Sequence, residues 1–358
     1  MFQNVVDSDP EENIMISPIS VNYALYMTYS GADGETKEEM ETALKLNGLD
    51  SEELNEQMHH LANYLEYGGV DLQIANSIWG RKNRVEFLDT FQDDMKDYYN
   101  ARMEELDFND PEASDTINNW VAENTEDKIE EMVPDNIPNG VLVYLINAIY
   151  FNGNWDIPFP EENTREDTFI TEKGEERTVD MMSISEEEFS YLENNLFQAV
   201  ALPYEDESYQ MTLYLPQEEN SLEDFYNEMN SQNWKKWQKE FMDLEGEVKL
   251  PKFKMEYEIE LNDVLKDMGM ETPFEDADLS KMFHQSQGIY ISEVLHKSFI
   301  EVDEKGTEAA AATSVAVEEA ASMHEFQIEF NRPFFYAIEN TEVDTILFMG
   351  VVHDPTLD

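Results

Sequence analysis

Residues 302–322 read VDEKGTEAAAATSVAVEEAAS, and this alanine-rich segment is the most informative part of the sequence. Alanine is the strongest helix former, so residues 308–321 could form a surface helix. The alternation of residue types along this segment offers a second interpretation, a β-strand. The odd-numbered positions from Thr307 to Val317 are uncharged and small or β-branched, whereas the even-numbered positions carry the charges. Such a strand could bury one face. A segment that suits more than one conformation is typical of a switch.

Short motifs on both sides of this segment occur in an order that is typical of one protein family. They are ISPIS at 16–20, GET at 34–36, ANSIW at 75–79, INNWV at 117–121, LINAIYFNGNW at 145–155, LPKF at 250–253, ADLS at 277–280, LHK at 295–297, EVDEKGTEAAAAT at 301–313, FNRPF at 330–334 and FMGVV at 348–352. Each motif is weak alone, but together they span nearly the whole chain. The sequence resembles the serpins, the serine protease inhibitor family, and its acidity suggests a salt-adapted, prokaryotic member.

The resemblance implies a fold and a mechanism. We expect a single serpin domain over residues 1–358, of the α+β class, with three β-sheets, about nine helices and an exposed reactive-centre loop at about residues 304–326. The family's inhibitors are suicide substrates and not enzymes, so no catalytic residues are expected. The target serine protease attacks the loop and forms an acyl-enzyme. The hinge of the loop then inserts as an extra strand into the central sheet and traps the covalent complex.

The resemblance also assigns site residues. The hinge comprises Glu304, Gly306, Thr307, Glu308, Ala309, Ala310, Ala311, Ala312 and Thr313. Glu304 and Lys252 match the pair that anchors the hinge at the top of the sheet, and Trp155 matches the tryptophan beneath that point. The polar cluster at which the central strands part is matched by Ser17, Ser20, Asn147 and His296. A buried, satisfied core histidine is compatible with this role for His296.

The position of the scissile bond is less well determined. Counting from the hinge glutamate places it between Ala320 and Ala321, whereas counting back from the FNRPF motif places it near Ser322 and Met323. The bond between Glu319 and Ala320 is a further alternative. Residues 307–330 contain no Lys or Arg, which argues against a trypsin-like target. A small residue before the bond favours subtilisin-like or elastase-like proteases.

The composition excludes several functions. The chain of 358 residues carries 80 Asp and Glu against 22 Lys and Arg, a formal net charge of −58, so it would repel the phosphates of nucleic acids. It has no cysteine for a disulfide or a thiolate metal site, and no apolar run approaches the roughly 20 residues that a membrane span needs. With 41% hydrophobic residues, disorder is not expected. So acidic a surface indicates adaptation to salt, which screens the repulsion between like charges.

Motifs that would support an enzyme are missing. The six histidines form no H-E-x-x-H pair, and the sequence contains neither G-x-S-x-G nor a phosphate-binding glycine loop. His59 and His60 are expected on a solvated helix surface, so no metal or cofactor is predicted. The competing hypothesis to an inhibitor is a non-inhibitory serpin that acts as a chaperone or binding protein. We expect a monomer with no membrane or nucleic-acid partner.

The sequence is compatible with two cellular locations. An inhibitor of secreted proteases is expected outside the cell, but the first residues, MFQNVVD, do not resemble a signal peptide, so a cytoplasmic location is the alternative.

Hydrophobic periodicity predicts helices mostly in the first third of the chain and strands mostly later, which is typical of the α+β class. A first helix is predicted to begin at Ser17 and Pro18 and to end near Gly31, and further helices are predicted at residues 35–46, 51–67, 87–99 and 111–124. The predicted strands are 70–79, 141–151, 197–203, 210–216, 247–257, 298–302, 325–330, 334–339 and 346–352.

Overall fold

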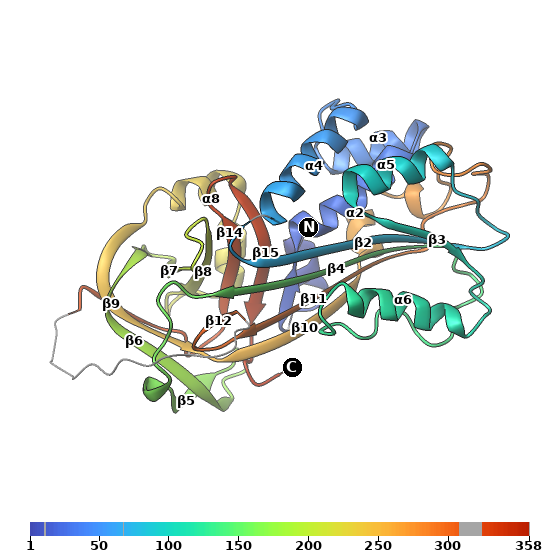
Figure 1. Cartoon of the computed structure of the whole chain (residues 1–358). Coiled ribbons are helices and arrows are strands. Elements are labelled where there is room, and N and C mark those ends of the chain that lie inside the picture. Colours follow the sequence, from blue (N-terminus) through green and yellow to red (C-terminus); the bar gives the residue numbers. More distant parts are fainter. Residues whose placement is uncertain (11, 67, 308–323, 358) are drawn as a thin grey trace.

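The computed structural model describes residues 1–10, 12–66, 68–307 and 324–357 (Figure 1). These residues contain nine α-helices: α1 (Phe2–Ser8), α2 (Pro18–Gly31), α3 (Gly34–Ala43), α4 (Ser51–Glu66), α5 (Asp89–Tyr99), α6 (Glu112–Glu123), α7 (Leu222–Glu228), α8 (Ser231–Trp237) and α9 (Asn262–Asp267). The start of α2 follows from its sequence. The Ser17 side chain accepts a hydrogen bond from the backbone N–H of Ser20, and Pro18 occupies the first turn.

A six-stranded sheet forms the centre of the molecule. Its order is β10 (Phe253–Glu260), β11 (Glu293–Val302), β12 (Gly306–Thr307), β4 (Val143–Asn154), β2 (Asp71–Arg81) and β3 (Arg102–Leu106). The strand β12 has only two residues, so β11 and β4 also pair directly with each other beyond it. Every residue of β4 from Val143 to Phe151 is buried, as predicted for a strand covered on both faces.

The remaining strands form a nine-stranded sheet. Its order is β1 (Ile14–Ile16), β15 (Thr345–Val352), β14 (Phe334–Asn340), β8 (Tyr209–Pro216), β7 (Phe197–Pro203), β6 (Glu176–Glu193), β9 (Met242–Pro251) and β13 (Phe326–Glu329), and β5 (Arg165–Ile170) also pairs with β6. The 18-residue strand β6 pairs with β5 near its beginning and with β7 at its end. It thereby joins the strands of two of the three expected sheets into one hydrogen-bonded sheet.

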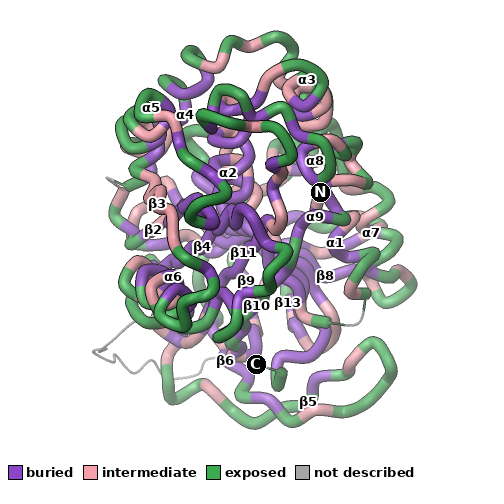
Figure 2. Tube along the Cα trace, turned by 90° about the vertical axis from the view of Figure 1, so that its right-hand side faces the viewer, coloured by how far each residue is buried: buried purple, intermediate pink, exposed green. Residues whose placement is uncertain are grey.

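Two apolar layers cover the faces of the six-stranded sheet. One is a small cluster beneath α6, in which Trp79 of β2 meets Trp120 of α6 with ring centroids 5.9 Å apart. The other is the main core, which α2, α4 and α5 cover from the opposite side (Figure 1). Figure 2 shows the buried residues concentrated along the strands and the exposed ones on the surrounding helices and loops. No helix in the described ranges is both long and apolar enough to cross a bilayer.

The structure confirms most of the predicted elements and corrects one. Residues 247–257, predicted as a single strand, belong to two strands in different sheets, β9 and β10, which are separated at Lys252. The long hairpin of β5 and β6 was not predicted, because its exposed stretches are rich in charge and lack an apolar run.

Candidate functional site

The site lies where β4 and β11 meet, a contact that we call the seam. The two strands are parallel neighbours, with Asn147 opposite His296 and Tyr150 opposite Phe299. At one end of the seam, β12 enters between them. Thr307 pairs with Val302 of β11 and with Gly153 of β4, in both cases antiparallel. The first two residues of a further strand are therefore already in place, and the rest of the seam is closed.

Glu304 anchors the turn that leads into β12. Its carboxylate accepts hydrogen bonds from Lys252 Nζ at 2.9 Å and from Thr164 Oγ1 at 2.8 Å, and the residue is only 8% exposed. Burial by itself would raise the pKa of Glu304, but the hydrogen bonds from Lys252 and Thr164 lower the pKa below its ordinary value. The pair that the resemblance assigns, Glu304 and Lys252, is thus in direct contact.

Trp155 holds the same turn from the other side. Its indole Nε1–H donates to the carbonyl of Asp303 at 3.1 Å, and its backbone N–H donates to the carbonyl of Lys305 at 2.8 Å. The indole ring stacks on Tyr204 with centroids 4.7 Å apart, and the Tyr204 hydroxyl lies 2.8 Å from Thr307 Oγ1. Thr307 is fully buried. The hinge therefore begins at a polar contact inside an aromatic pocket.

Gly306 is needed because the backbones approach closely here. A Cβ atom on Gly306 would lie 2.1 Å from the carbonyl oxygen of Gly153, a backbone atom that cannot move without breaking the strand pairing. A side chain at this position would displace β12 from β4.

The polar cluster of Ser17, Ser20, Asn147 and His296 lies in the middle of the seam. The Ser17 backbone N–H donates to His296 Nε2 at 3.1 Å, which leaves Nδ1 to donate to Asn147 Oδ1 at 2.6 Å. Asn147 Nδ2 donates to the Ser20 carbonyl at 3.0 Å and to the Ser20 hydroxyl. Complete burial lowers the pKa of His296 to about 3, so the ring is neutral at ordinary pH.

Three residues that contact the hinge or the polar cluster were not predicted from the sequence. Tyr204 and Thr164 contact the hinge from loops that carry no sequence pattern of their own. Asn76 of β2 extends the polar cluster, because its Oδ1 accepts from Asn147 Nδ2 at 2.7 Å. Asn76 lies within the ANSIW motif, and a polar residue in an apolar strand was the available signal.

Part of the predicted site lies outside the described residues. This applies to Glu308, Ala309, Ala310, Ala311, Ala312 and Thr313 of the hinge and to the alternative scissile positions Glu319, Ala320, Ala321, Ser322 and Met323. The loop was assigned to residues 304–326, and the described residues at its two ends belong to β-strands. Thr307 pairs within the six-stranded sheet, and Phe326 stacks on Tyr191 with centroids 4.0 Å apart, in the nine-stranded one.

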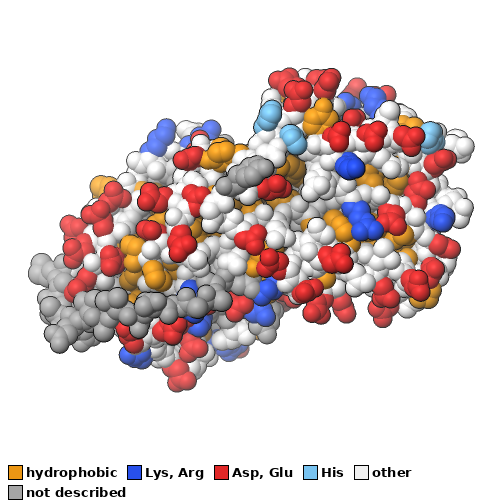
Figure 3. Space-filling model, viewed as in Figure 1, with side chains coloured by type: hydrophobic (Ala, Val, Ile, Leu, Met, Phe, Trp, Pro, Cys, Tyr) orange, Lys and Arg blue, Asp and Glu red, His pale blue; other side chains and the backbone are white. Residues whose placement is uncertain are grey.

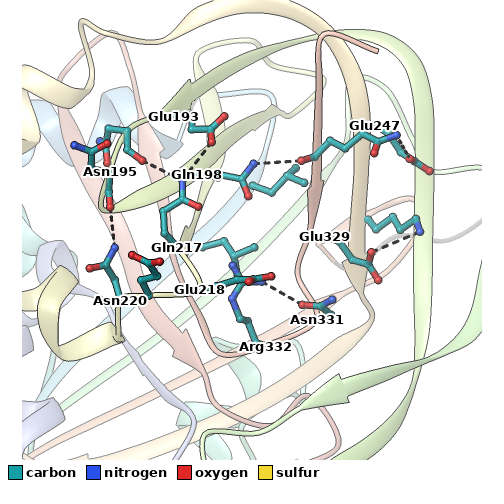
Figure 4. A pocket seen from close by; sticks show the side chains of 16 residues that line it. Glu193, Asn195, Gln198, Gln217, Glu218, Asn220, Glu247, Glu329, Asn331 and Arg332 are labelled. Atoms are coloured by element: carbon teal, nitrogen blue, oxygen red, sulfur yellow. Dashed lines mark hydrogen bonds and ion pairs between the residues drawn. The ribbon is translucent and has the colours of Figure 1, made fainter. Parts of the chain in front are cut away.

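A groove of about 740 Å³ lies beside β13 and is lined mainly by amide and carboxylate side chains (Figure 4). Gln217 and Gln198 are tied to neighbours, the former to Glu193 and the latter to the carbonyl of Gln327. The lining contains no serine, threonine, histidine or cysteine, so it holds no hydroxyl or thiol nucleophile beside an imidazole base. Among the described residues, no group of three or more His, Asp or Glu is placed to hold a metal.

Acidic side chains dominate the surface. Figure 3 shows Asp and Glu spread across the face in view, where they outnumber Lys and Arg. One lysine of β11 is buried and paired with two of these carboxylates. Lys297, 6% exposed, pairs with Glu256 at 2.7 Å and with Glu258 at 3.2 Å.

Comparison with known proteins agrees with this geometry. The family model for Serpin (serine protease inhibitor) matches residues 1–355. Serpin B6 of Pongo abelii is 36% identical over 97% of this chain and 94% of its own length. The leukocyte elastase inhibitor of Xenopus tropicalis is 34% identical over 99% of this chain and 96% of its own. The native structure of tengpin, a thermophilic serpin, superposes with a TM-score of 0.89 at 34% identity, covering 96% of this chain and 89% of tengpin.

The match extends over nearly the full length in sequence and in structure, and it includes both sheets and the hinge. The chain therefore belongs to the serpin family of serine protease inhibitors.

Proposed function

We propose that this protein is a suicide-substrate inhibitor of serine proteases. The serine Oγ of the protease attacks the carbonyl carbon of Ala320, and the amide bond to Ala321 breaks. The acyl group stays on the protease as an ester, and the new amino terminus is that of Ala321. The hinge then enters the seam as a full strand and carries the acyl-enzyme with it before water can hydrolyse the ester.

The position of Thr307 is the observation that carries the proposal. It is already paired on both sides, so insertion needs only to lengthen β12. Continuing its antiparallel register by six residues brings Thr313 opposite both His296 and Asn147, which are opposite each other now. A threonine hydroxyl there would replace the hydrogen bond that these two residues lose when the strands part. The alanines between would pass the strands at small steric cost.

The target class follows from the loop sequence. With no Lys or Arg at residues 307–330, the loop does not offer a trypsin-like protease its preferred residue. Alanine before the bond suits the shallow or apolar pockets of subtilisin-like and elastase-like proteases. One relative is named a leukocyte elastase inhibitor, which agrees with this choice. We further propose that the protein acts outside the cell, as a monomer, in a salt-rich setting.

The experiment mixes the protein with a salt-tolerant subtilisin and with an elastase in 2 M KCl. A band at the summed mass that survives denaturing electrophoresis, together with a released peptide that starts at Ala321, is expected. Cleavage without such a band, followed by a rise in melting temperature, would indicate a substrate whose loop still inserts. Cleavage with no rise would favour the alternative, a non-inhibitory serpin acting as a chaperone or binding protein.

A further inference from the structure

Arg81 is a buried cation at the end of the seam opposite the hinge. It is the last residue of β2, which runs antiparallel to β4, with Gly80 opposite Val143 at the beginning of β4. The hinge lies at the other end of β4, where Thr307 pairs with Gly153. Arg81 is 5% exposed, although arginine is almost never fully buried unless it is paired. Its burial therefore calls for a partner.

The hydrogen-bond acceptors of Arg81 in this structure are all neutral. Its Nε donates to the carbonyl of Val141 at 2.6 Å, Nη2 to the carbonyl of Pro138 at 2.7 Å and Nη1 to Asn109 Oδ1 at 3.4 Å. Among the residues that the structure describes, Arg81 takes part in no ion pair. Asp107 acts on it only electrostatically and accepts hydrogen bonds from Asn109 instead. Desolvation lowers the pKa of Arg81, because the guanidinium has lost water without gaining a carboxylate.

The guanidinium points from β2 toward the seam. Val141 and Pro138, whose carbonyls it contacts, belong to the segment that leads into β4, and β4 is the strand between β2 and the seam. The side chain lies on the face that α6 covers, because its guanidinium carbon is 5.0 Å from the ring centroid of Phe108, a member of the small apolar cluster beneath α6. An acidic side chain that arrives at this end of the seam on the same face would meet Arg81.

The pairing of Thr307 with Gly153 determines which loop residue would arrive there. Continuing this antiparallel pairing by eleven residues brings residue 318, a glutamate, opposite Leu142. Leu142 is the neighbour of Arg81 on the other side, because the Arg81 backbone N–H donates to the Leu142 carbonyl at 2.8 Å. Glu318 itself lies outside the described residues, and its place in the inserted strand follows from this register alone.

The same register gives the face on which Glu318 would lie. Residue 310 would pass between Tyr150 and Phe299, which both belong to the cluster beneath α6. Side chains alternate along a strand, so all even-numbered loop residues, Glu318 included, would face α6 as Arg81 does. With β4 between them, the Cα atoms of Glu318 and Arg81 would be about 10 Å apart, at about 4.8 Å per strand. The two long side chains together span this distance.

We infer that Arg81 is the receptor for the Glu318 carboxylate once the cleaved loop has inserted. This inference rests on the proposed function. The ion pair forms only in the inserted state, so it stabilises that state relative to the native one and holds the last part of the new strand at the end of the seam. Glu318 precedes all three alternative scissile bonds, so it stays on the inserting side whichever of them is cleaved.

Glu319 provides a matched control, because it has the same side chain one position further and alternation turns it to the opposite face. The test cleaves the loop of the full-length protein with subtilisin and measures melting by calorimetry. Glu318→Gln should lower the melting temperature of the cleaved form by at least about 2 °C and leave that of the intact protein unchanged. Glu319→Gln should change neither. No decrease for Glu318→Gln, or an equal decrease for both variants, would overturn the inference.

Removing the receptor identifies the partner. In an Arg81→Met background, Glu318→Gln should have no further effect on the cleaved form, since the two residues act as one pair. An undiminished effect there would place the partner of Glu318 elsewhere and overturn the assignment. If Arg81→Met does not fold, a crystal structure of the cleaved wild type decides, with a carboxylate oxygen of Glu318 expected within about 4 Å of a guanidinium nitrogen of Arg81. A longer distance would overturn the receptor.

The wild type separates this inference from the proposed function. If cleavage does not raise its melting temperature, the loop has not inserted, which overturns the proposed function and the Arg81 receptor together. A rise in the wild type with no difference between Glu318→Gln and Glu319→Gln overturns the receptor alone.

Discussion

Thr307 is the side chain through which the hinge enters the sheet, and its surroundings make a direct prediction. The residue is fully buried with its Oγ1 on the Tyr204 hydroxyl. In Thr307→Arg a guanidinium would have to enter this space without a carboxylate partner, which is costly. We expect the yield of covalent protease complex to fall at least about tenfold while loop cleavage continues.

Thr307→Ser is the matched control, because it keeps the hydroxyl and should keep most of the complex. Densitometry of denaturing gels at fixed protease gives both yields. A full yield from Thr307→Arg would contradict insertion through this position.

His296 predicts a pH dependence of stability. Its folded pKa of about 3 lies below the ordinary value of 6.5, so the unfolded chain binds the proton first as the pH falls. The stabilising contribution is therefore complete above about pH 6.5 and is lost between there and about pH 3, at up to about 1.4 kcal/mol per pH unit. The free energy of unfolding should fall more steeply with decreasing pH in the wild type than in His296→Gln.

Urea unfolding at half-unit steps of pH measures this difference. The difference between the free energies of unfolding of the wild type and His296→Gln cancels the contribution of the many carboxylates, which both proteins share. A difference that stays constant from pH 6.5 to 3.5 would show that His296 is not buried and neutral.

At the scale of elements, the ion pair between Glu304 and Lys252 is one of the contacts that hold the turn between β11 and β12. Glu304→Gln removes the charge that Lys252 and Thr164 contact. Because the Lys252 side chain is 38% exposed, solvent screening limits the loss to about 1 kcal/mol. The pKa of Glu304 is lowered in the folded state, so this contribution is present above about pH 4.5 and is lost as the pH falls through that value and the folded pKa.

The melting temperatures of the wild type and Glu304→Gln at pH 7 and at pH 3 check this prediction. Glu301→Gln, on the neighbouring strand β11, is the control and should show little effect. Equal melting temperatures of the wild type and Glu304→Gln at pH 7 would rule out an anchoring role.

Elements with local sequence signals were predictable, and those defined by their partners were not. The cap and apolar stretch of α2 and the apolar run of β4 are local signals, and both elements were found. The break at Lys252 was missed because both strands alternate and no loop residues separate them. The buried positions nevertheless change from even numbers, Val248 and Leu250, to odd numbers, Phe253 and Met255. The strands also differ in their partners, because β9 pairs with β6 and β10 with β11.

The same distinction holds within the site. Family motifs brought Glu304 and Lys252 together correctly, as they did Asn147 and His296. Tyr204 contacts Thr307 from a loop 103 positions away in the sequence, and no local sequence pattern predicts such a contact. Side-chain packing between the two sheets determines it.

For the whole molecule, the dominant property is charge. With 80 acidic and 22 basic residues, the folded chain repels itself, and the repulsion is stronger in the compact state than in the extended one. Salt shortens the Debye length to about 3 Å near 1 M and should stabilise the fold. We expect the melting temperature to rise continuously from dilute buffer to 2 M KCl.

Differential scanning calorimetry across that range measures the effect. Potassium glutamate at equal ionic strength is a control for ion-specific effects. A melting temperature that does not change between dilute buffer and 2 M KCl would contradict salt adaptation.

Because Trp155 contacts the hinge, its intrinsic fluorescence should report on movement of the hinge without an added label. The indole stacks on Tyr204 and donates to the Asp303 carbonyl. Trp79 of β2 packs against Trp120 of α6, and Trp234 and Trp237 lie on α8. Indole emission shifts with local polarity and hydrogen bonding, so lengthening of β12 should change the emission of Trp155 more than that of the other four tryptophans. Stopped-flow fluorescence could then follow strand entry in an unlabelled inhibitor, with Trp155→Phe as the blank.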